Sequence, residues 1–130
     1  MRKKVLIVSA TYYVDFSKQL EMWAIKHLDN ERIKNKIIQV PGVFEIPVII
    51  SKNIKKYDGF IALGCVIKGE TPHFDFISQA TTNAIMKLSI DHNKPVGNGI
   101  ITCLTKEQAE KRSMKKGGEA AKAVISVLSH

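Results

Sequence analysis

The stretch FIALGCVI at residues 60–67 is an unbroken apolar run that follows Asp58-Gly59 and precedes Lys68-Gly69. A continuous apolar run of this length is typical of a strand that is buried on both faces of a parallel sheet. Outward from it, shorter segments that are rich in β-branched residues occur at residues 5–8, 36–40 and 99–103. The sequence therefore predicts a sheet built from these segments.

Between the predicted strands, apolar residues recur at the spacing of amphipathic helices. Pro47 suits the first turn of one helix, and residues 105–108 match the capping box that opens another. The Gly117-Gly118 pair is expected to break the helix that precedes it. The predicted helices cover residues 16–28, 46–54, about 71–88, 105 to the glycine pair, and 120–128.

Strands that alternate with helices predict one α/β domain over residues 1–130. Right-handed crossovers then place helices on both faces of the sheet. The expected fold is a three-layer sandwich with a parallel four-stranded sheet in a flavodoxin-like arrangement.

The charge of the chain favours a small anionic substrate over a polyanion. Lys and Arg number 20 and Asp and Glu number 12, which gives a formal net charge of +8. The excess is spread evenly along the chain, whereas a nucleic-acid groove concentrates basic and aromatic residues on one face. We therefore expect no nucleic-acid partner.

Cysteine usage and hydropathy indicate neither a metal site nor a membrane segment. Cys65 and Cys103 lack the spacing of a zinc or redox pair and are expected to pack as small hydrophobes. The apolar run after the basic residues 2–4 is too short for a signal peptide, and no stretch approaches the roughly 18 apolar residues of a membrane span. These patterns predict a cytoplasmic protein without a membrane partner.

In an open parallel sheet, ligands bind beyond the carboxyl ends of the strands. Here those ends are followed by loops at residues 9–14, 40–45, 66–73 and 102–105. In the third loop, Thr71 is expected to be the N-cap of a helix that begins near Pro72. Exposed helix amides attract phosphate, with Lys68 and Arg112 adding charge, although many such turns are well-capped helices that bind nothing.

His73 is predicted to lie in the first turn of that helix. The helix dipole disfavours an imidazolium there, which leaves a neutral ring to accept protons. The alternative is a surface or capping histidine. Tyr12 and Tyr13 follow the first strand, where one aromatic ring is expected to stack on a planar ligand or to pack in the core.

Several common sites lack their motifs. The sequence contains no dinucleotide-binding or P-loop glycine pattern. A receiver domain is excluded because the first and third strands end without the carboxylates that such a domain requires. Ser9-Ala10-Thr11 partly meets the needs of a flavin mononucleotide site, so a non-catalytic flavin-binding module remains an alternative.

The motifs PGVFEIP (41–47), ALGCVIKGETPHFDF (62–76), PVGNGIITCLTKEQAEKR (95–112) and KKGGEAA (115–121) resemble those of the lumazine synthase family. The resemblance implies a cytoplasmic transferase of riboflavin biosynthesis. It condenses 5-amino-6-(D-ribitylamino)uracil with 3,4-dihydroxy-2-butanone 4-phosphate and releases 6,7-dimethyl-8-ribityllumazine, phosphate and water. No cofactor or metal takes part. The family also implies a homopentamer with active sites at subunit interfaces, and riboflavin synthase as a candidate partner.

The same resemblance assigns roles to individual residues. His73 matches the proton-transfer residue and Tyr12 the aromatic that stacks on the pyrimidine. Asn98 stands where several members carry an aromatic lid from the neighbouring subunit, so a polar lid is implied. The segments that hold the ribityl chain and ring edge match Val43, Phe44, Glu45, Cys65, Val66 and Ile67, and the phosphate partners match Glu70, Thr71, Arg112 and Lys116. A purely structural shell protein is the third class left open.

Overall fold

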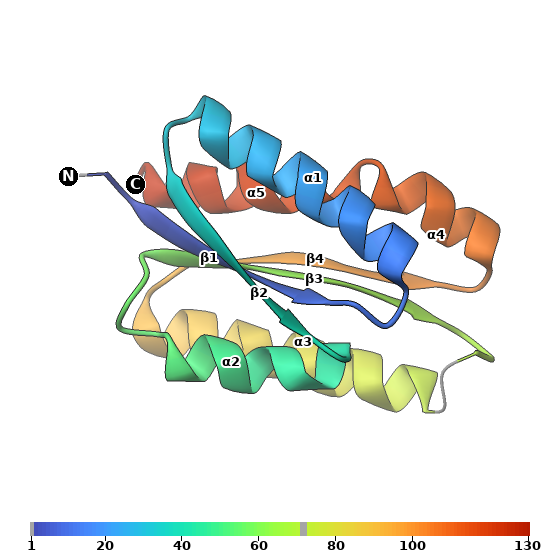
Figure 1. The fold of residues 1–130 in the computed structure, drawn as a ribbon. Coiled ribbons are helices and arrows are strands. Elements are labelled where there is room, and N and C mark those ends of the chain that lie inside the picture. The colour runs from blue at the N-terminus through green and yellow to red at the C-terminus, as the bar shows by residue number, and fades with distance from the viewer. Residues whose placement is uncertain (1, 71–72) are drawn as a thin grey trace.

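The computed structural model describes residues 2–70 and 73–130. Strands and helices alternate along these residues as the sequence predicts (Figure 1). The elements are β1 (Lys4–Ala10), α1 (Val14–Asn30), β2 (Lys34–Val40), the 3-10 helix η1 (Val43–Glu45), α2 (Ile46–Lys52), β3 (Gly59–Ile67), α3 (Phe74–His92), β4 (Val96–Cys103), α4 (Lys106–Ser113) and α5 (Lys116–Leu128).

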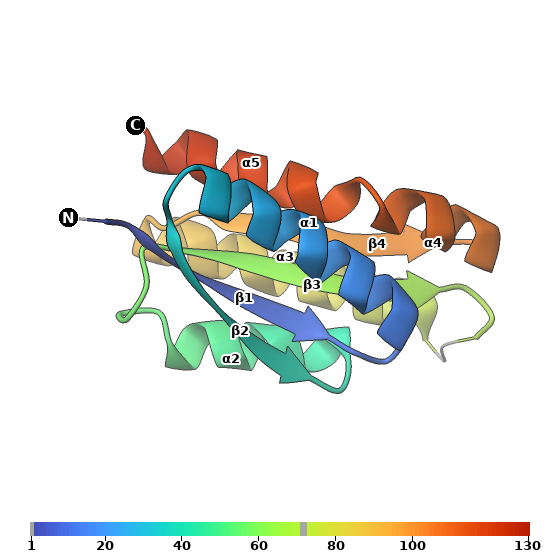
Figure 2. The ribbon, with the colours of Figure 1, turned by 45° about the horizontal axis from the view of Figure 1, so that its top comes forward.

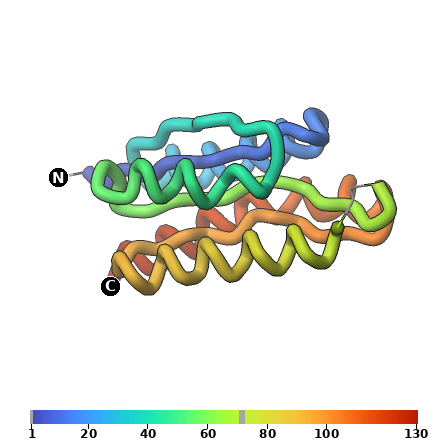
Figure 3. Tube along the Cα trace, turned by 90° about the horizontal axis from the view of Figure 1, so that it is seen from below, coloured from blue at the N-terminus to red at the C-terminus, as the bar shows by residue number. Residues whose placement is uncertain are grey.

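The four strands form one parallel sheet in the order β2-β1-β3-β4. Helices α1, α4 and α5 cover one face of the sheet, and α2 and α3 cover the other (Figures 1 and 2). Figure 3 shows α2 and α3 from below, lying across their face of the sheet. The predicted α/β three-layer sandwich with a flavodoxin-like arrangement is confirmed.

Each face of the sheet has its own hydrophobic core, because successive side chains of a strand point to opposite faces. In β1, Val5 and Ile7 belong to one cluster, and Leu6 and Val8 belong to the other. The helices complete these clusters with Leu20, Ala24 and Val124 on the first face and with Ile46, Ile50 and Ile85 on the second. Burial on both faces explains why β3 is apolar throughout.

Helix α3 begins at Phe74, so its predicted start near Thr71 and Pro72 is wrong. His73 is the N-cap and has a left-handed backbone, with φ 60° and ψ 39°. Its carbonyl oxygen accepts the first helical hydrogen bond, from the Ile77 N–H at 2.8 Å. His73 thus precedes the first turn instead of lying in it, and Thr71 and Pro72 are outside the described residues.

The predicted role of the Gly117-Gly118 pair as a helix breaker is also wrong. Both glycines lie in the first turn of α5, and the chain leaves the α4 helix at Met114 and Lys115. A Cβ at Gly117 would clash with the carbonyl oxygen of Leu20 in α1. The glycine therefore allows α5 to approach α1 closely.

Helix α4 starts where the capping-box pattern predicts. Thr105 is its N-cap, and the Thr105 hydroxyl accepts a hydrogen bond from the Gln108 N–H at 3.2 Å. No helix within the described residues is long and apolar enough to cross a membrane.

Candidate active site

The loops that follow the strands gather at one edge of the sheet, at the right-hand end of the molecule in Figure 1. This edge is formed by the carboxyl ends of the parallel strands, where ligands bind in this class of fold. The predicted position of the loops is therefore confirmed.

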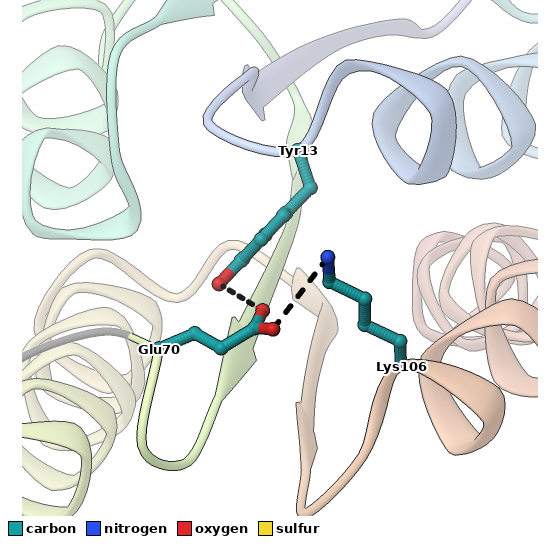
Figure 4. Close-up of polar contacts among 3 residues, drawn as sticks. All are labelled: Tyr13, Glu70 and Lys106. Carbon is teal, nitrogen blue, oxygen red and sulfur yellow. Dashed lines mark hydrogen bonds and ion pairs between the residues drawn. The ribbon is translucent and has the colours of Figure 1, made fainter.

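Three of these loops are joined by polar contacts of Glu70 (Figure 4). The Tyr13 hydroxyl donates a hydrogen bond to Glu70 Oε2 at 3.2 Å, and Lys106 Nζ lies 3.6 Å from Glu70 Oε1. Tyr13 follows β1, Glu70 follows β3 and Lys106 is the first residue of α4. We call these residues the Glu70 cluster. The sequence pattern places Lys106 at the start of a helix, but it does not indicate that Lys106 contacts Glu70.

The two adjacent tyrosines have different environments. The Tyr12 side chain is 62% exposed, whereas Tyr13 is half-buried and bonded to Glu70. Their rings meet edge to face, with centroids 4.9 Å apart and an interplanar angle of 81°. Tyr12 is thus the ring that a planar ligand can reach, and Tyr13 belongs to the framework beneath it.

His73 lines two hollows, one with charged residues and one that is apolar. The charged hollow, of about 560 Å³, contains Lys68, Glu70 and Asp75 together with Phe74 and Phe76. The apolar hollow, of about 580 Å³, is lined by Phe44, His73, Phe76 and Ile77. Phe44 and Phe76 are 61% and 72% exposed, so a large apolar surface stands beside the imidazole.

The other predicted residues of this edge have side chains that support the loops from within. Val43, Val66 and Ile67 are buried, and Val43 packs against Gly64 of β3. Glu45 Oε1 accepts a hydrogen bond from the Gly42 N–H at 2.9 Å and caps η1. These residues therefore shape the edge of the site through packing and capping.

Both cysteines are free and buried, as expected of small hydrophobes. Burial raises the pKa of the Cys65 thiol to about 12, and the Cys103 thiol and the Glu70 carboxylate add to the rise. Burial also raises the pKa of Cys103, against the opposing effect of Arg112. Since the thiolate is the reactive form, neither cysteine is suited to act as a nucleophile at neutral pH.

The remaining predicted site residues lie along β4, α4 and α5. Arg112 and Lys116 line a cleft of about 640 Å³ together with Lys111, Lys115 and Glu119. Within the described residues, this cleft shares no lining residue with the two hollows beside His73. The predicted set therefore divides into two groups. The His73 group, which contains Tyr12, Glu70 and His73, lies on the loops, and the Arg112 group, which contains Arg112 and Lys116, lines the cationic cleft.

Arg112 and Asn98 are held by backbone groups of β4. Arg112 Nη1 donates to the Thr102 carbonyl oxygen at 2.9 Å. Asn98 Oδ1 accepts from the Ile100 N–H at 3.0 Å, although the Asn98 side chain remains exposed. In the part of the chain that the structure describes, no group of three or more His, Cys, Asp or Glu is placed to hold a metal ion.

This fold and these loops define an α/β domain with a small-molecule site at the carboxyl edge of its parallel sheet. The family model for 6,7-dimethyl-8-ribityllumazine synthase matches residues 2–130, and the chain belongs to that family. The predicted family is thereby confirmed, and with it the prediction of an enzyme, a transferase.

Curated relatives agree along almost the whole chain. A 6,7-dimethyl-8-ribityllumazine synthase 1 of Rhodopseudomonas palustris is 40% identical over 96% of this chain and 83% of its own length. Synthases of the same name from Methylorubrum populi and Bartonella tribocorum are also 40% identical, over 97% and 99% of this chain and 81% and 91% of their own lengths. These similarities favour a lumazine synthase of riboflavin biosynthesis over a flavin-binding module.

Proposed function

We propose that the chain condenses 5-amino-6-(D-ribitylamino)uracil with 3,4-dihydroxy-2-butanone 4-phosphate to form 6,7-dimethyl-8-ribityllumazine, phosphate and water. The family match over residues 2–130 is the observation that carries this proposal. As the family resemblance implies, the proposed enzyme uses neither a metal nor a cofactor. It works in the cytoplasm, with riboflavin synthase as a candidate partner.

We further propose that each active site is shared by two copies of the chain in a homopentamer. The division between the His73 group and the Arg112 group supports this arrangement, because within the described residues of one chain the hollows beside His73 share no lining residue with the Arg112 cleft. The exposed Phe44 and Phe76 beside His73 supply apolar area that a second copy can cover. In this arrangement Arg112, Lys116 and Asn98 of one copy face His73 of its neighbour.

The substrates then occupy both groups. The pyrimidine ring stacks on the exposed Tyr12, and residues 43–45 and 65–67 border the ribityl chain and the ring edge. Phe44 exposes its side chain there, and Asn98 provides a polar lid. Asn98 Oδ1 already accepts a backbone hydrogen bond, so its Nδ2 amide is the group that can donate to a ring carbonyl.

Arg112 and Lys116 bind the phosphate of the second substrate, and Thr71, a further predicted phosphate partner, lies outside the described residues. The cleft that holds these cations also contains Lys111 and Lys115, against one carboxylate, Glu119. Glu70 differs from the other predicted phosphate partners because its carboxylate is itself an anion and already contacts Tyr13 and Lys106. We therefore propose that Glu70 serves the phosphate indirectly, through the shape of its loop.

The reaction starts when the uracil amine attacks the ketone. The resulting carbinolamine loses water to give an imine, and phosphate leaves by elimination to give an enol that tautomerises to a ketone. The second amine attacks this ketone, and loss of a second water closes the ring. Each step moves a proton, and histidine changes its protonation near neutral pH. His73 is exposed at the mouth of both hollows, where its ring can relay protons among the reacting carbons, the amines and the leaving phosphate.

The experiment that tests this proposal is a two-substrate assay of His73→Ala, read by lumazine absorbance. A well-placed proton-transfer group contributes about 10²- to 10⁴-fold to the rate, so kcat is expected to fall by that factor while KM changes little. Turnover persists because orientation of two substrates supplies about 7–11 kcal/mol on its own. His92→Ala, at the exposed end of α3, is the matched control and should keep wild-type kcat.

Each alternative gives a distinct result in the same assay. Wild-type turnover by His73→Ala would remove the proton-relay assignment. A wild-type protein that holds flavin mononucleotide but forms no lumazine would be a binding module. Assembled particles without turnover would indicate a shell protein.

A further inference from the structure

The Glu70 cluster connects the loop that leads to His73 with the loops that follow β1 and β4. Both carboxylate oxygens of Glu70 are used: Oε2 accepts from Tyr13 at 3.2 Å, and Oε1 lies 3.6 Å from Lys106 Nζ. The three side chains converge from three separate segments of the chain (Figure 4). Such contacts fix the distance between loops that are otherwise far apart in the sequence.

Backbone hydrogen bonds hold the start of the loop after β3. The Lys68 N–H donates to the Cys103 carbonyl oxygen at 2.9 Å, and the Glu70 N–H donates to the Ile67 carbonyl oxygen at 3.3 Å. Gly69 has a left-handed backbone with φ 84°, and a Cβ placed there would meet nothing within 4 Å. His73 also has a left-handed backbone, at φ 60°, which is uncommon for a residue other than glycine. Glu70 and His73 line the same charged hollow. The Glu70 side chain adds contacts that tie this hollow to Tyr13 after β1 and to Lys106 after β4.

The other end of the cluster reaches the ring-stacking side of the site. Tyr13 contacts Tyr12 edge to face at 4.9 Å, and Tyr12 is the exposed ring that the proposed function places against the pyrimidine. The contacts thus run from Tyr12 through Tyr13 to Glu70, and Glu70 lines the same hollow as His73. A change in this chain of contacts changes the spacing between the stacked ring and the imidazole.

We propose that Glu70 is a positioning residue for His73, held in place by Tyr13 and Lys106; this inference rests on the proposed function. Glu70 does not exchange protons with the substrates. It sets the spacing between the Tyr12 ring and the His73 imidazole, which is the geometry that proton transfer in the condensation requires. Misplacement of a catalytic group by about 1 Å can lower a rate by about 10²-fold.

A contribution to stability alone predicts a different outcome. The side chains of Lys106 and Glu70 are 64% and 40% exposed, and exposed ion pairs contribute little to folding. Removal of the Glu70 side chain is therefore expected to leave the melting temperature nearly unchanged. A change in kcat without a change in stability separates positioning from support of the fold.

The experiment is a double-mutant cycle on the full chain, with Glu70→Ala and His73→Ala measured singly and together in the two-substrate assay. We expect Glu70→Ala to lower kcat about 10-fold, within the range that misplacement allows, with little change in KM for the pyrimidine. In the His73→Ala background, Glu70→Ala should cause no further loss, because residues that act as a unit are not additive.

Conservative and control variants complete the design. The amide oxygen of Glu70→Gln still accepts from Tyr13 but no longer pairs with Lys106, so its loss of kcat should fall between wild type and Glu70→Ala. Asp91→Ala removes the exposed Lys87–Asp91 ion pair, 3.0 Å long, from α3 and should keep wild-type kcat. This control tests whether the loss of any exposed ion pair is enough to slow the enzyme.

The outcomes separate this inference from the proposed function. Lumazine formation by the wild type and its loss in His73→Ala test the proposed function alone. If Glu70→Ala keeps wild-type kcat, or multiplies the loss in His73→Ala by the same factor as in wild type, the positioning role is overturned while the proposed function stands. If Glu70→Ala lowers kcat only in the protein that retains His73, the positioning role is supported.

Discussion

The His73 group and the Arg112 group are built in different ways. His73, Tyr12 and Glu70 stand on loops at the carboxyl edge of the sheet, where polar side-chain contacts restrain them. Arg112 and Lys116 stand on α4 and α5, and α5 packs closely against α1 through Gly117. One group stands on loops and has an apolar hollow beside it, whereas the other is cationic and stands on packed helices.

The difference assigns complementary tasks to the two groups. Proton transfer depends on small distances, and the Glu70 cluster gives the loops a means to set them. Phosphate binding depends on a fixed positive charge. The guanidinium of an arginine on a helix supplies this charge together with several coplanar N–H donors. Since neither group performs both tasks, a complete site requires the two to meet.

We expect the largest effect when the two groups are inactivated in different chains and those chains are then assembled into one oligomer. Arg112→Ala should raise KM for the phosphate substrate about 10- to 100-fold, the equivalent of a lost hydrogen bond to a charged group. Co-expression of Arg112→Ala with His73→Ala should restore activity, because random assortment leaves roughly a quarter of the interfaces with both groups intact. Lumazine formation by the purified mixed oligomer is the measurement.

Lys122→Ala is the control for loss of one exposed cation, since Lys122 lies on α5 but does not line the cationic cleft. It should keep the wild-type KM. If the mixed oligomer shows no more than the sum of the two residual activities, the groups act within one chain and the shared-site proposal is wrong.

A smaller effect should follow from filling the contact between α5 and α1. Gly117→Ala adds a methyl group that clashes with the Leu20 carbonyl oxygen, and overpacking of this kind costs about 1–3 kcal/mol. Helix propensity alone predicts the opposite sign, a gain of about 1 kcal/mol. The denaturant midpoint therefore decides whether the close approach of the helices or local propensity dominates.

Ser126→Ala is the matched substitution, because Ser126 is exposed on the same helix. It should leave the midpoint unchanged or raise it slightly. A stabilised Gly117→Ala variant would show that the contact with α1 relaxes readily and that the cationic group is less firmly mounted than the comparison of the two regions implies.

These two regions also differ in how far the sequence predicted them. The strands follow from apolar runs such as residues 60–67, and the start of α4 follows from Thr105, because both signals are local. The prediction that the Gly117-Gly118 pair breaks a helix is wrong because Gly117 is required for a close contact with α1, which is distant in sequence. The start of α3 was placed early because the left-handed backbone of His73 leaves no pattern in the residues.

The site residues show the same boundary between local and tertiary information. The residue pattern alone leaves open which tyrosine packs, whereas the family resemblance points to Tyr12 as the stacking ring. In the structure Tyr12 is exposed and Tyr13 is bonded to Glu70. Lys106 was missed as a member of the cluster because only the fold brings α4 beside the loop after β3. Motifs identified the chemistry, but their division into two groups required the arrangement of the elements in space.

The smallest effect concerns the two buried thiols, each of which lies near one of these regions. The pKa of Cys65 is raised from 9.0 to about 12, by burial and then by Cys103 and Glu70. Between these values the folded state keeps a proton that the unfolded state has lost. The stability that this neutral thiol contributes is thus complete below about pH 9 and falls as pH rises toward 12.

Cys65→Ser removes this titration, so its free energy of unfolding should decline less steeply than that of wild type between pH 9 and 12. Measured by ultraviolet absorbance of the thiolate, Glu70→Gln should lower the pKa of Cys65, because one of the charges that raises it is gone. Arg112→Ala should instead raise the pKa of Cys103, since Arg112 lowers it. If neither variant shifts the pKa of the thiol beside it, the two thiols sense burial alone, and the opposite effects of Glu70 and Arg112 on the buried thiols are ruled out.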